Sequence, residues 1–446
     1  MRKSVFSSLS LQQKEAVGLL QIGTFLEYFD LMLYVHMAVL LNELFFPKTD
    51  PHTASLIAAF AFCSTYVLRP FGALLFGWIG DNIGRKSTVI ITTMIMAFSC
   101  VVMANVPTYA QIGIAAAWIV TACRILQGLS SMGEIMGAII YLTELIKPPF
   151  QYPVVSLVAL SSSLGAMCAL GVASLVTHFG FDWRIAFWVG AGIAVIGSVA
   201  RTKLRESPEF LAIKLKKQQN IETYGKNSEQ EKKEIKESKT PPKNILAYFF
   251  IECSYALMFY VVFIYFTPTL KSFGSSAGDI ITHNFYLSML AVVFNVAAVI
   301  LVKYIHPLKI MLFRANMYLG IILIFPFAIN YSSSVLSIFC LQTLFLLARG
   351  GATPADSIFV RGVNVRKRVS LITMNYALSR SVMHISSAFG LVYLTEWIGH
   401  YGIWIIAIPV SVGYVWSIRH FQKLEGLGAN SDGSYELIGS TVEMKV

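Results

Sequence analysis

The chain has 446 residues, of which 56% are hydrophobic and only 13% are charged, and its formal net charge is +11. This composition excludes a water-soluble globular protein, whose surface needs far more charge, and it places the chain in a lipid bilayer. The positive charge lies mainly in loops beside apolar segments, where it sets membrane orientation, so it does not indicate nucleic-acid binding.

Apolar segments long enough to cross a bilayer follow one another along the chain. A helix needs roughly 20 apolar residues to span the hydrocarbon core. The first segment follows a short basic stretch without a cleavage signal, so we expect it to insert the chain and not to be removed. The sequence predicts an all-α membrane protein with twelve transmembrane helices, at residues 16–41, 55–78, 87–106, 112–136, 154–178, 184–201, 245–267, 283–304, 309–330, 333–358, 369–395 and 400–418.

A polar, lysine-rich stretch divides these spans into six plus six. We predict an N-terminal six-helix bundle at 1–201, a cytoplasmic linker at 202–244, a C-terminal six-helix bundle at 245–418 and a cytoplasmic tail at 419–446. Lysines of the linker could meet anionic lipid headgroups, although a solvated loop is the commoner outcome for such a stretch.

Weak similarity relates the two predicted bundles. Glu27 in the first span has a counterpart in Glu252 of the seventh, and Arg124 of the fourth span has one in Arg349 of the tenth. Such placement is typical of a duplicated six-helix unit, whose two copies are related by a pseudo-symmetry axis along the membrane normal.

The distribution of Lys and Arg predicts the orientation of the chain. Most of the 35 basic residues fall on one side of the predicted spans, whereas the other side holds Lys48, Arg184 and Lys271. Positive loops are retained in the cytoplasm. Both termini are therefore predicted to be cytoplasmic. As a separate expectation, the membrane is the inner membrane of a bacterial cell.

The turn between the second and third spans, residues 77–86, reads Gly-Trp-Ile-Gly-Asp-Asn-Ile-Gly-Arg-Lys. Glycines permit a tight turn and close helix contact, while Asp81 and Arg85 can pair with helix ends and charges across the interface between the bundles. The spacing matches the pattern G-x-x-x-D-x-x-G-R-K and resembles the major facilitator superfamily. We predict a conformational latch made of Gly77, Asp81, Gly84, Arg85, Lys86 and Glu144.

A block in the fourth span narrows the resemblance. Arg124, Gln127 and Gly128, followed by residues 133–134 and 137–138, resemble the pattern R-x-x-Q-G-x-x-x-G-G-E-x-x-G-A of the metabolite:proton symporter family. That family includes carriers of proline and betaine, α-ketoglutarate, citrate and shikimate. The resemblance covers nearly all of residues 16–210, and it implies a binding site at mid-depth between two bundles that rock against each other.

Ionisable residues inside spans cost roughly 2.5 to 3.5 kcal/mol each, so each one is a candidate for function. Glu27, Asp30 and Tyr34 share one face of the first span, and Arg124, Gln127, Ser131 and Glu134 form a similar stripe on the fourth. An acid that pairs with Arg124 when charged and releases it when protonated would couple transport to protons. We assign proton coupling to Glu27, Asp30, Arg124 and Glu134.

Two alternatives to that assignment stay open. Glu27 or Asp30 could simply hold helices together through polar contacts, and Glu134 and Glu144 could pair with Arg85 in a structural role.

The predicted substrate site draws on both halves. Guanidinium groups bind carboxylates in two-pronged fashion, so the arginines inside spans favour an organic anion. His384 could titrate and join the proton path, although a lone histidine is more often a packing residue. Tyrosines such as Tyr255 could instead enclose a cationic group. The candidates are Tyr34, Arg69, Gln127, Glu252, Tyr255, Arg349, Tyr376, Arg380 and His384; for Arg69, bonding to carbonyls freed by a kink at Pro70 is the equal alternative.

These patterns predict a secondary active transporter that imports a small carboxylate-bearing metabolite together with a proton, and that works as a monomer. The alternative substrate is a zwitterionic osmolyte such as proline or betaine; a non-transporting membrane receptor is a third reading. The sequence shows no phosphate-binding loop or nucleophile motif, and its six cysteines have no metal-ligand spacing, so we expect no enzyme, cofactor or metal.

Overall fold

A computed structural model describes residues 9–46, 60, 63, 66–202, 206, 211–212, 214–215, 240–429 and 435–437, apart from the side chains of a few helical residues. The chain is helical over almost all of this length. The helices of the first half are α1 (Leu11–Phe45), α3 (Arg69–Asn82), α4 (Arg85–Asn105), the short α5 (Tyr109–Ile112), α6 (Ile114–Leu145), α7 (Gln151–Phe179) and α8 (Arg184–Arg201).

The second half is more interrupted. Its α-helices are α11 (Pro242–Tyr260), α12 (Thr267–Ser272), α13 (Ala277–Leu301), α14 (Pro307–Asn330), α15 (Val335–Ala348), α16 (Asp356–Arg361), α17 (Arg368–Ile385), α18 (Leu391–Ile398) and α19 (Ile403–Leu424). Two π-helical turns, η2 (Val261–Tyr265) and η4 (Ser386–Gly390), continue α11 and α17, and 3-10 turns η3 (Val365–Lys367) and η5 (Gly399–Gly402) precede α17 and α19. Such π turns often occur at functional sites.

The predicted spans can be compared with these helices one by one. In the part of the chain that the structure describes, eight helical segments are long and apolar enough to cross a membrane, and the last of them, Val365–Leu424, contains both predicted spans 369–395 and 400–418. Two shorter apolar helices correspond to the predicted spans 184–201 and 333–358. The predicted span 55–78 is described mainly through α3, because most of residues 47–65 lie outside the described part of the chain. The fourth span was predicted too short, since α6 continues to Leu145.

The prediction of one continuous helix at 333–358 is wrong. The helix ends at Ala348 and resumes at Asp356 as α16. Gly351 has φ +114°, a conformation that favours glycine, and a Cβ on Gly350 would lie 2.8 Å from the carbonyl oxygen of Ser254. These glycines let the backbone leave the helix and approach α11 closely. We call residues 349–355 the helix break.

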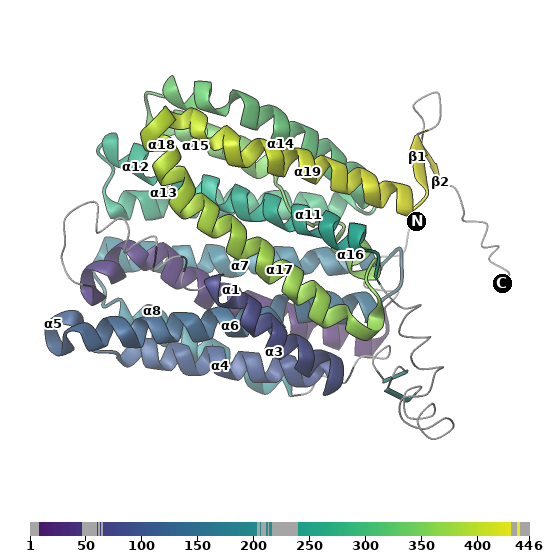
Figure 1. Ribbon diagram of the computed structural model, residues 1–446. Helices are drawn as coiled ribbons and strands as arrows, with labels where there is room; N and C mark the ends of the chain where they lie inside the picture. Colours follow the sequence, from purple (N-terminus) through teal and green to yellow (C-terminus); the bar gives the residue numbers. More distant parts are fainter. Residues whose placement is uncertain are drawn as a thin grey trace.

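The two halves lie side by side (Figure 1), with α1 packed on α6, α7 and α8 in one half and α11 packed on α17 and α19 in the other. Between the halves, α7 lies against α13 and α3 lies against α17. The main contacts across the molecule therefore run along two helix pairs, and space for a ligand lies between them.

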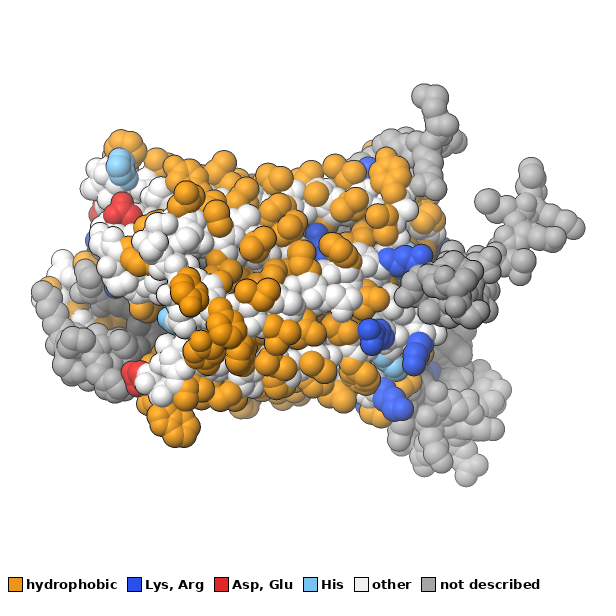
Figure 2. Space-filling model, turned by 90° about the horizontal axis from the view of Figure 1, so that it is seen from above, with side chains coloured by type: hydrophobic (Ala, Val, Ile, Leu, Met, Phe, Trp, Pro, Cys, Tyr) orange, Lys and Arg blue, Asp and Glu red, His pale blue; other side chains and the backbone are white. Residues whose placement is uncertain are grey.

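The surface is that of a membrane protein. In Figure 2 hydrophobic side chains cover the middle of the face, and Lys and Arg gather mainly at the end where the termini lie in Figure 1. Large apolar side chains such as Phe313, Leu336 and Trp118 are about 70% exposed, at 71%, 70% and 69%. Patches of this kind need lipid.

The tail departs from the purely helical prediction. Strands β1 (Leu427–Ala429) and β2 (Tyr435–Leu437) pair antiparallel after α19. This small ribbon lies outside the helical body and does not change the fold class.

Candidate functional site

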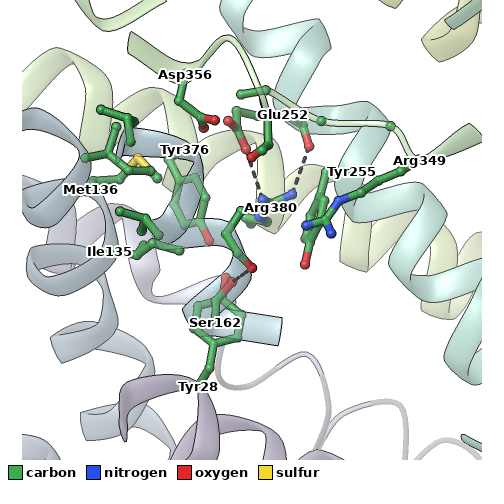
Figure 3. A pocket seen from close by; sticks show the side chains of 18 residues that line it. Tyr28, Ile135, Met136, Ser162, Glu252, Tyr255, Arg349, Asp356, Tyr376 and Arg380 are labelled. Carbon is green, nitrogen blue, oxygen red and sulfur yellow. Dashed lines mark hydrogen bonds and ion pairs between the residues drawn. The ribbon is translucent and has the colours of Figure 1, made fainter. Parts of the chain in front are cut away.

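A central cavity of about 40 Å³ lies between the two halves, beside the helix break (Figure 3). Its polar wall comes from α11, the helix break, α16 and α17. Its other wall comes from α1, α6 and α7 and is mostly apolar, with Tyr28 and Ser162 as its polar members. Among the predicted substrate residues, the structure brings together Glu252, Tyr255, Arg349, Tyr376 and Arg380.

Arg380 is held firmly in this cavity. Its guanidinium forms an ion pair with Glu252 at 3.0 Å and donates a second hydrogen bond, at 2.9 Å, to the backbone carbonyl of the same residue. The guanidinium also lies 4.3 Å from the ring centre of Tyr255 and 4.5 Å from that of Tyr376. Arg380 and Glu252 are both buried, so they neutralise each other inside the membrane.

Arg349, the first residue of the helix break, has a different environment. Its guanidinium donates to the side-chain oxygen of Asn295 at 2.6 Å, and Asn295 in turn donates to Ser163 of α7 at 2.6 Å. Tyr255 lies under the guanidinium at 5.3 Å. Within the described part of the chain Arg349 has no ion-pair partner. Its positive charge therefore stays available to a ligand.

Hydrogen bonds fix the helix break against its neighbours. The amide of Gly351 donates to the Ser254 hydroxyl at 2.9 Å, and the Tyr414 hydroxyl donates to the carbonyl of Gly351 at 3.0 Å. Irregular backbone at membrane depth is tolerated where it lines a cavity or is buried in protein, as here.

Two charged residues of the second half escaped the sequence prediction. Asp356 begins α16, is 6% exposed and lines the cavity. Arg314 lies within α14 and is buried. Asp356 lies at the predicted end of a span, where an acid is common and does not indicate a functional site. Only the helix break shows that it lies in the cavity.

A second cavity, of about 50 Å³, adjoins the first through Tyr28, Ser162, Tyr255 and Arg349, which line both. Its remaining lining is mainly apolar, from α1, α7, α11, α13 and α15. The site as a whole therefore has a charged part beside the helix break and an apolar part beyond Arg349.

The predicted proton-coupling residues Asp30 and Arg124 lie in a separate polar chain within the first half. Asp30 interacts with Cys100, Gln127 donates to the Cys100 sulfur at 3.7 Å, and Arg124 donates to Gln127 at 3.3 Å. Tyr34 covers Arg124, with 3.9 Å between guanidinium and ring centre. Asp30 is thus connected to Arg124 through two intervening side chains.

The other predicted residues of this region have varied positions. Glu27 is buried in α1, one turn before Asp30, and the side chain of Glu134 lies outside the described residues. The guanidinium of Arg69 lies 4.2 Å from the ring centre of Tyr66, and the ring centre of His384 lies 3.9 Å from that of Tyr66, with the two rings tilted by 44°. Tyr34, Arg69, Gln127 and His384 line neither cavity, so their role in substrate binding stays a prediction.

The predicted latch joins the two halves at the end where α3 meets α17, which we call the latch end. Asp81 accepts hydrogen bonds from the amide and hydroxyl of Ser370, at 2.9 and 2.6 Å, and so caps the first turn of α17. A Cβ on Gly77 would lie 2.9 Å from the Cα of Ser370, so only glycine permits this approach.

Glu144 adds a second link at the latch end. It forms a buried ion pair with Arg368 of α17 at 3.2 Å. Gly84 lies beside the carboxylate of Glu206, which also receives the amide of Lys86 at 3.4 Å. The side chain of Arg85, the partner expected for Glu144, lies outside the described residues.

Comparison with known proteins identifies the fold and family. Residues 20–400 match the model of the Major Facilitator Superfamily. By structure the chain is similar to the proton:xylose symporter XylE bound to 6-bromo-6-deoxy-D-glucose (TM-score 0.74, 15% identity, covering 92% of this chain and 95% of that one). It is also similar to the human organic anion transporter MFSD10 (TM-score 0.66, 14% identity, 92% and 99% covered).

By sequence the chain is similar to the inner membrane metabolite transport protein YhjE of Escherichia coli, with 35% identity over 209 residues, and to the proline/betaine transporter of Salmonella typhimurium, with 31% over 204 residues. These matches cover 45% and 44% of this chain, and they span 48% and 41% of the relatives' own length, less than half of each. The family model covers most of the chain, and the fold of the solved structures agrees with it: the chain belongs to the Major Facilitator Superfamily.

Proposed function

We propose that the protein imports a small carboxylate-bearing metabolite together with a proton. The observation that carries this proposal is Arg349, a guanidinium on the cavity wall whose described side-chain bond goes to a neutral amide. A carboxylate is the natural two-pronged partner for such a group.

Rocking of the two halves supplies alternating access in this proposal. Two interactions hold the latch end closed: the hydrogen bonds from Ser370 to Asp81 and the ion pair between Glu144 and Arg368. Both must break before that end can open. The row of interacting side chains from Asp30 through Cys100 and Gln127 to Arg124 is one place where binding of a proton could change the packing of the first half. The basic residues at the end with the termini support a cytoplasmic latch end in a bacterial inner membrane.

A zwitterionic osmolyte such as proline or betaine is the second candidate. Rings of Tyr28, Tyr255 and Tyr376 border the cavity near two acids, Glu252 and Asp356, and this arrangement also suits a cationic group beside a carboxylate. A relative named as a proline/betaine transporter favours the same reading.

Uptake into proteoliposomes tests both candidates. Radiolabelled dicarboxylates, citrate, shikimate, proline and betaine are offered with and without an inward proton gradient, to the wild type, Arg349→Gln and the control Lys303→Gln, which removes an exposed positive charge outside the cavity. Losing a charge-assisted hydrogen bond of about 1.5 to 3 kcal/mol should lower carboxylate uptake roughly 10- to 100-fold in Arg349→Gln alone. Gradient-independent betaine uptake, with no carboxylate transported, would replace the first proposal by the second.

A further inference from the structure

Asp356 is a buried acid in the central cavity that the proton-coupling residues predicted from sequence do not include. It opens α16 directly after the helix break, and Figure 3 shows its carboxyl group pointing to the same space as that of Glu252. Thr353 and its own backbone amide interact with its carboxylate. Within the described residues Asp356 forms no ion pair.

Titratable and charged groups surround Asp356 from several elements. Glu252 and Tyr248 face it from α11, Arg349 from the helix break, and Tyr414 from α19. From α17, Tyr376 and Arg380 share the cavity, and the half across the cavity offers Tyr28 as its titratable side chain. Arg380 already forms an ion pair with Glu252. Asp356 is therefore a second acid in the cavity, and Arg380 does not neutralise it.

The geometry points to Asp356 as the residue that carries the transported proton and thereby makes the cavity accept a carboxylate. This inference rests on the proposed function. With Asp356 ionised, the cavity holds two arginines and two acids, Glu252 and Asp356, and is neutral. When Asp356 takes up a proton, one positive charge is left over, and a single carboxylate on Arg349 restores neutrality. Because uncompensated charge is costly inside a membrane, proton and anion enter together.

The same residue separates the two candidate substrates. A zwitterion brings its own positive charge, which an ionised Asp356 attracts while Arg349 binds the carboxylate. Such a substrate fills the neutral cavity without a proton. The protonation of Asp356 therefore decides which chemistry the site selects.

Infrared spectroscopy of the purified transporter tests the proton without any substrate. The carbonyl stretching band of a protonated carboxylic acid is followed from acidic to alkaline pH in the wild type, Asp356→Asn, Asp356→Glu and Asp30→Asn. We expect a titrating band that disappears in Asp356→Asn, persists at a shifted position in Asp356→Glu, and is unchanged in Asp30→Asn. A wild type without such a band, or a band that survives in Asp356→Asn, overturns the proposal.

Transport supplies the second readout, with the same probe compounds. Two activities are compared: accumulation of labelled carboxylate driven by the proton gradient, and exchange of labelled for unlabelled carboxylate. In Asp356→Asn the ratio of accumulation to exchange should fall to the value measured in vesicles without a gradient. Accumulation that still follows the gradient would assign the proton elsewhere. If the wild type transports none of the carboxylates, the proposed function fails, while the infrared result still decides whether Asp356 holds a proton.

Discussion

At the scale of single residues, the two arginines of the cavity have opposite roles because of their partners. Arg380 is paired with an acid and enclosed by two tyrosine rings, whereas Arg349 bonds to an amide. The first is therefore part of the structure of the cavity wall, and the second is the group to which our proposal assigns the ligand.

The Glu252–Arg380 pair gives a stability prediction. Glu252→Gln or Arg380→Gln alone leaves one buried charge unpaired, which typically costs about 3–5 kcal/mol. The double variant leaves none, so it should be more stable than either single variant. Thermal unfolding in detergent measures all four proteins. Single variants that melt like the wild type would show that the pair contributes nothing to stability.

Residue types predicted much of this site, but not its grouping. Costly polar residues inside apolar spans pointed to Glu252, Tyr255, Arg349, Tyr376 and Arg380, and the cavity contains them all. A sequence does not show which of two polar clusters a residue joins. The expected single site thus lies in two places, with Tyr34, Arg69, Gln127 and His384 grouped around Arg124 and Tyr66.

At the scale of elements, hydropathy predicts where helices lie and not where they are broken. The segment 333–358 is apolar enough for a span, and its break depends on close approach between Gly350 and Ser254, a contact distant in sequence. The latch was more predictable, because its glycines and its capping acid have a fixed local spacing.

The helix break yields a prediction with a matched control. Ala at position 351 must adopt φ +114°, and its Cβ would lie 3.0 Å from the Cβ of Tyr255 and 3.1 Å from the ring atom Cδ2. Gly351→Ala should therefore displace Tyr255 and reduce uptake severely. Gly320→Ala lies in α14 with open space around it, so it should leave uptake intact and gain up to about 1 kcal/mol of helix stability. Equal uptake by the two variants would mean that the shape of the break is unimportant.

The start of α14 gives a prediction about pH. His306 accepts the amide of Leu308 at 3.4 Å, and its ring lies edge-on to Tyr152 of α7. Burial, and next the charge of Lys309, lower the pKa of His306 to about 4. The unfolded chain, with a pKa of about 6.5 there, binds a proton that the folded protein does not. This contribution to stability is complete above pH 6.5 and is lost as the pH falls toward about 4.

His306→Asn keeps a capping side chain without that titration. Melting temperatures in detergent should fall more on acidification in the wild type than in His306→Asn. Parallel curves for the two proteins would remove His306 from the pH dependence.

At the scale of the whole molecule, the two halves touch along α3–α17 at the latch end and along α7–α13, which runs toward the opposite end. Both contacts cannot persist through a transport cycle, because a ligand at mid-depth needs an exit at each side in turn. The hydroxyls of Ser174 on α7 and Thr282 on α13 are 2.9 Å apart, so in the proposed cycle they mark a contact that has to separate when the end opposite the latch end opens.

A disulfide at this point tests the movement of the halves. Ser174→Cys with Thr282→Cys, in a background where the six native cysteines are replaced, should cross-link under oxidation and stop uptake, and reduction should restore it. Each single cysteine variant is the control for oxidation itself. If the cross-linked protein transported at the full rate, α7 and α13 would stay together throughout the cycle, and the ligand would have to leave along the α3–α17 side alone. If the cross-link instead stops uptake, the α7–α13 contact must open during transport, and with it the hydrogen bonds that join Ser163, Asn295 and Arg349. Substrate binding at Arg349 and separation of the halves would then both require the Arg349–Asn295 hydrogen bond to break.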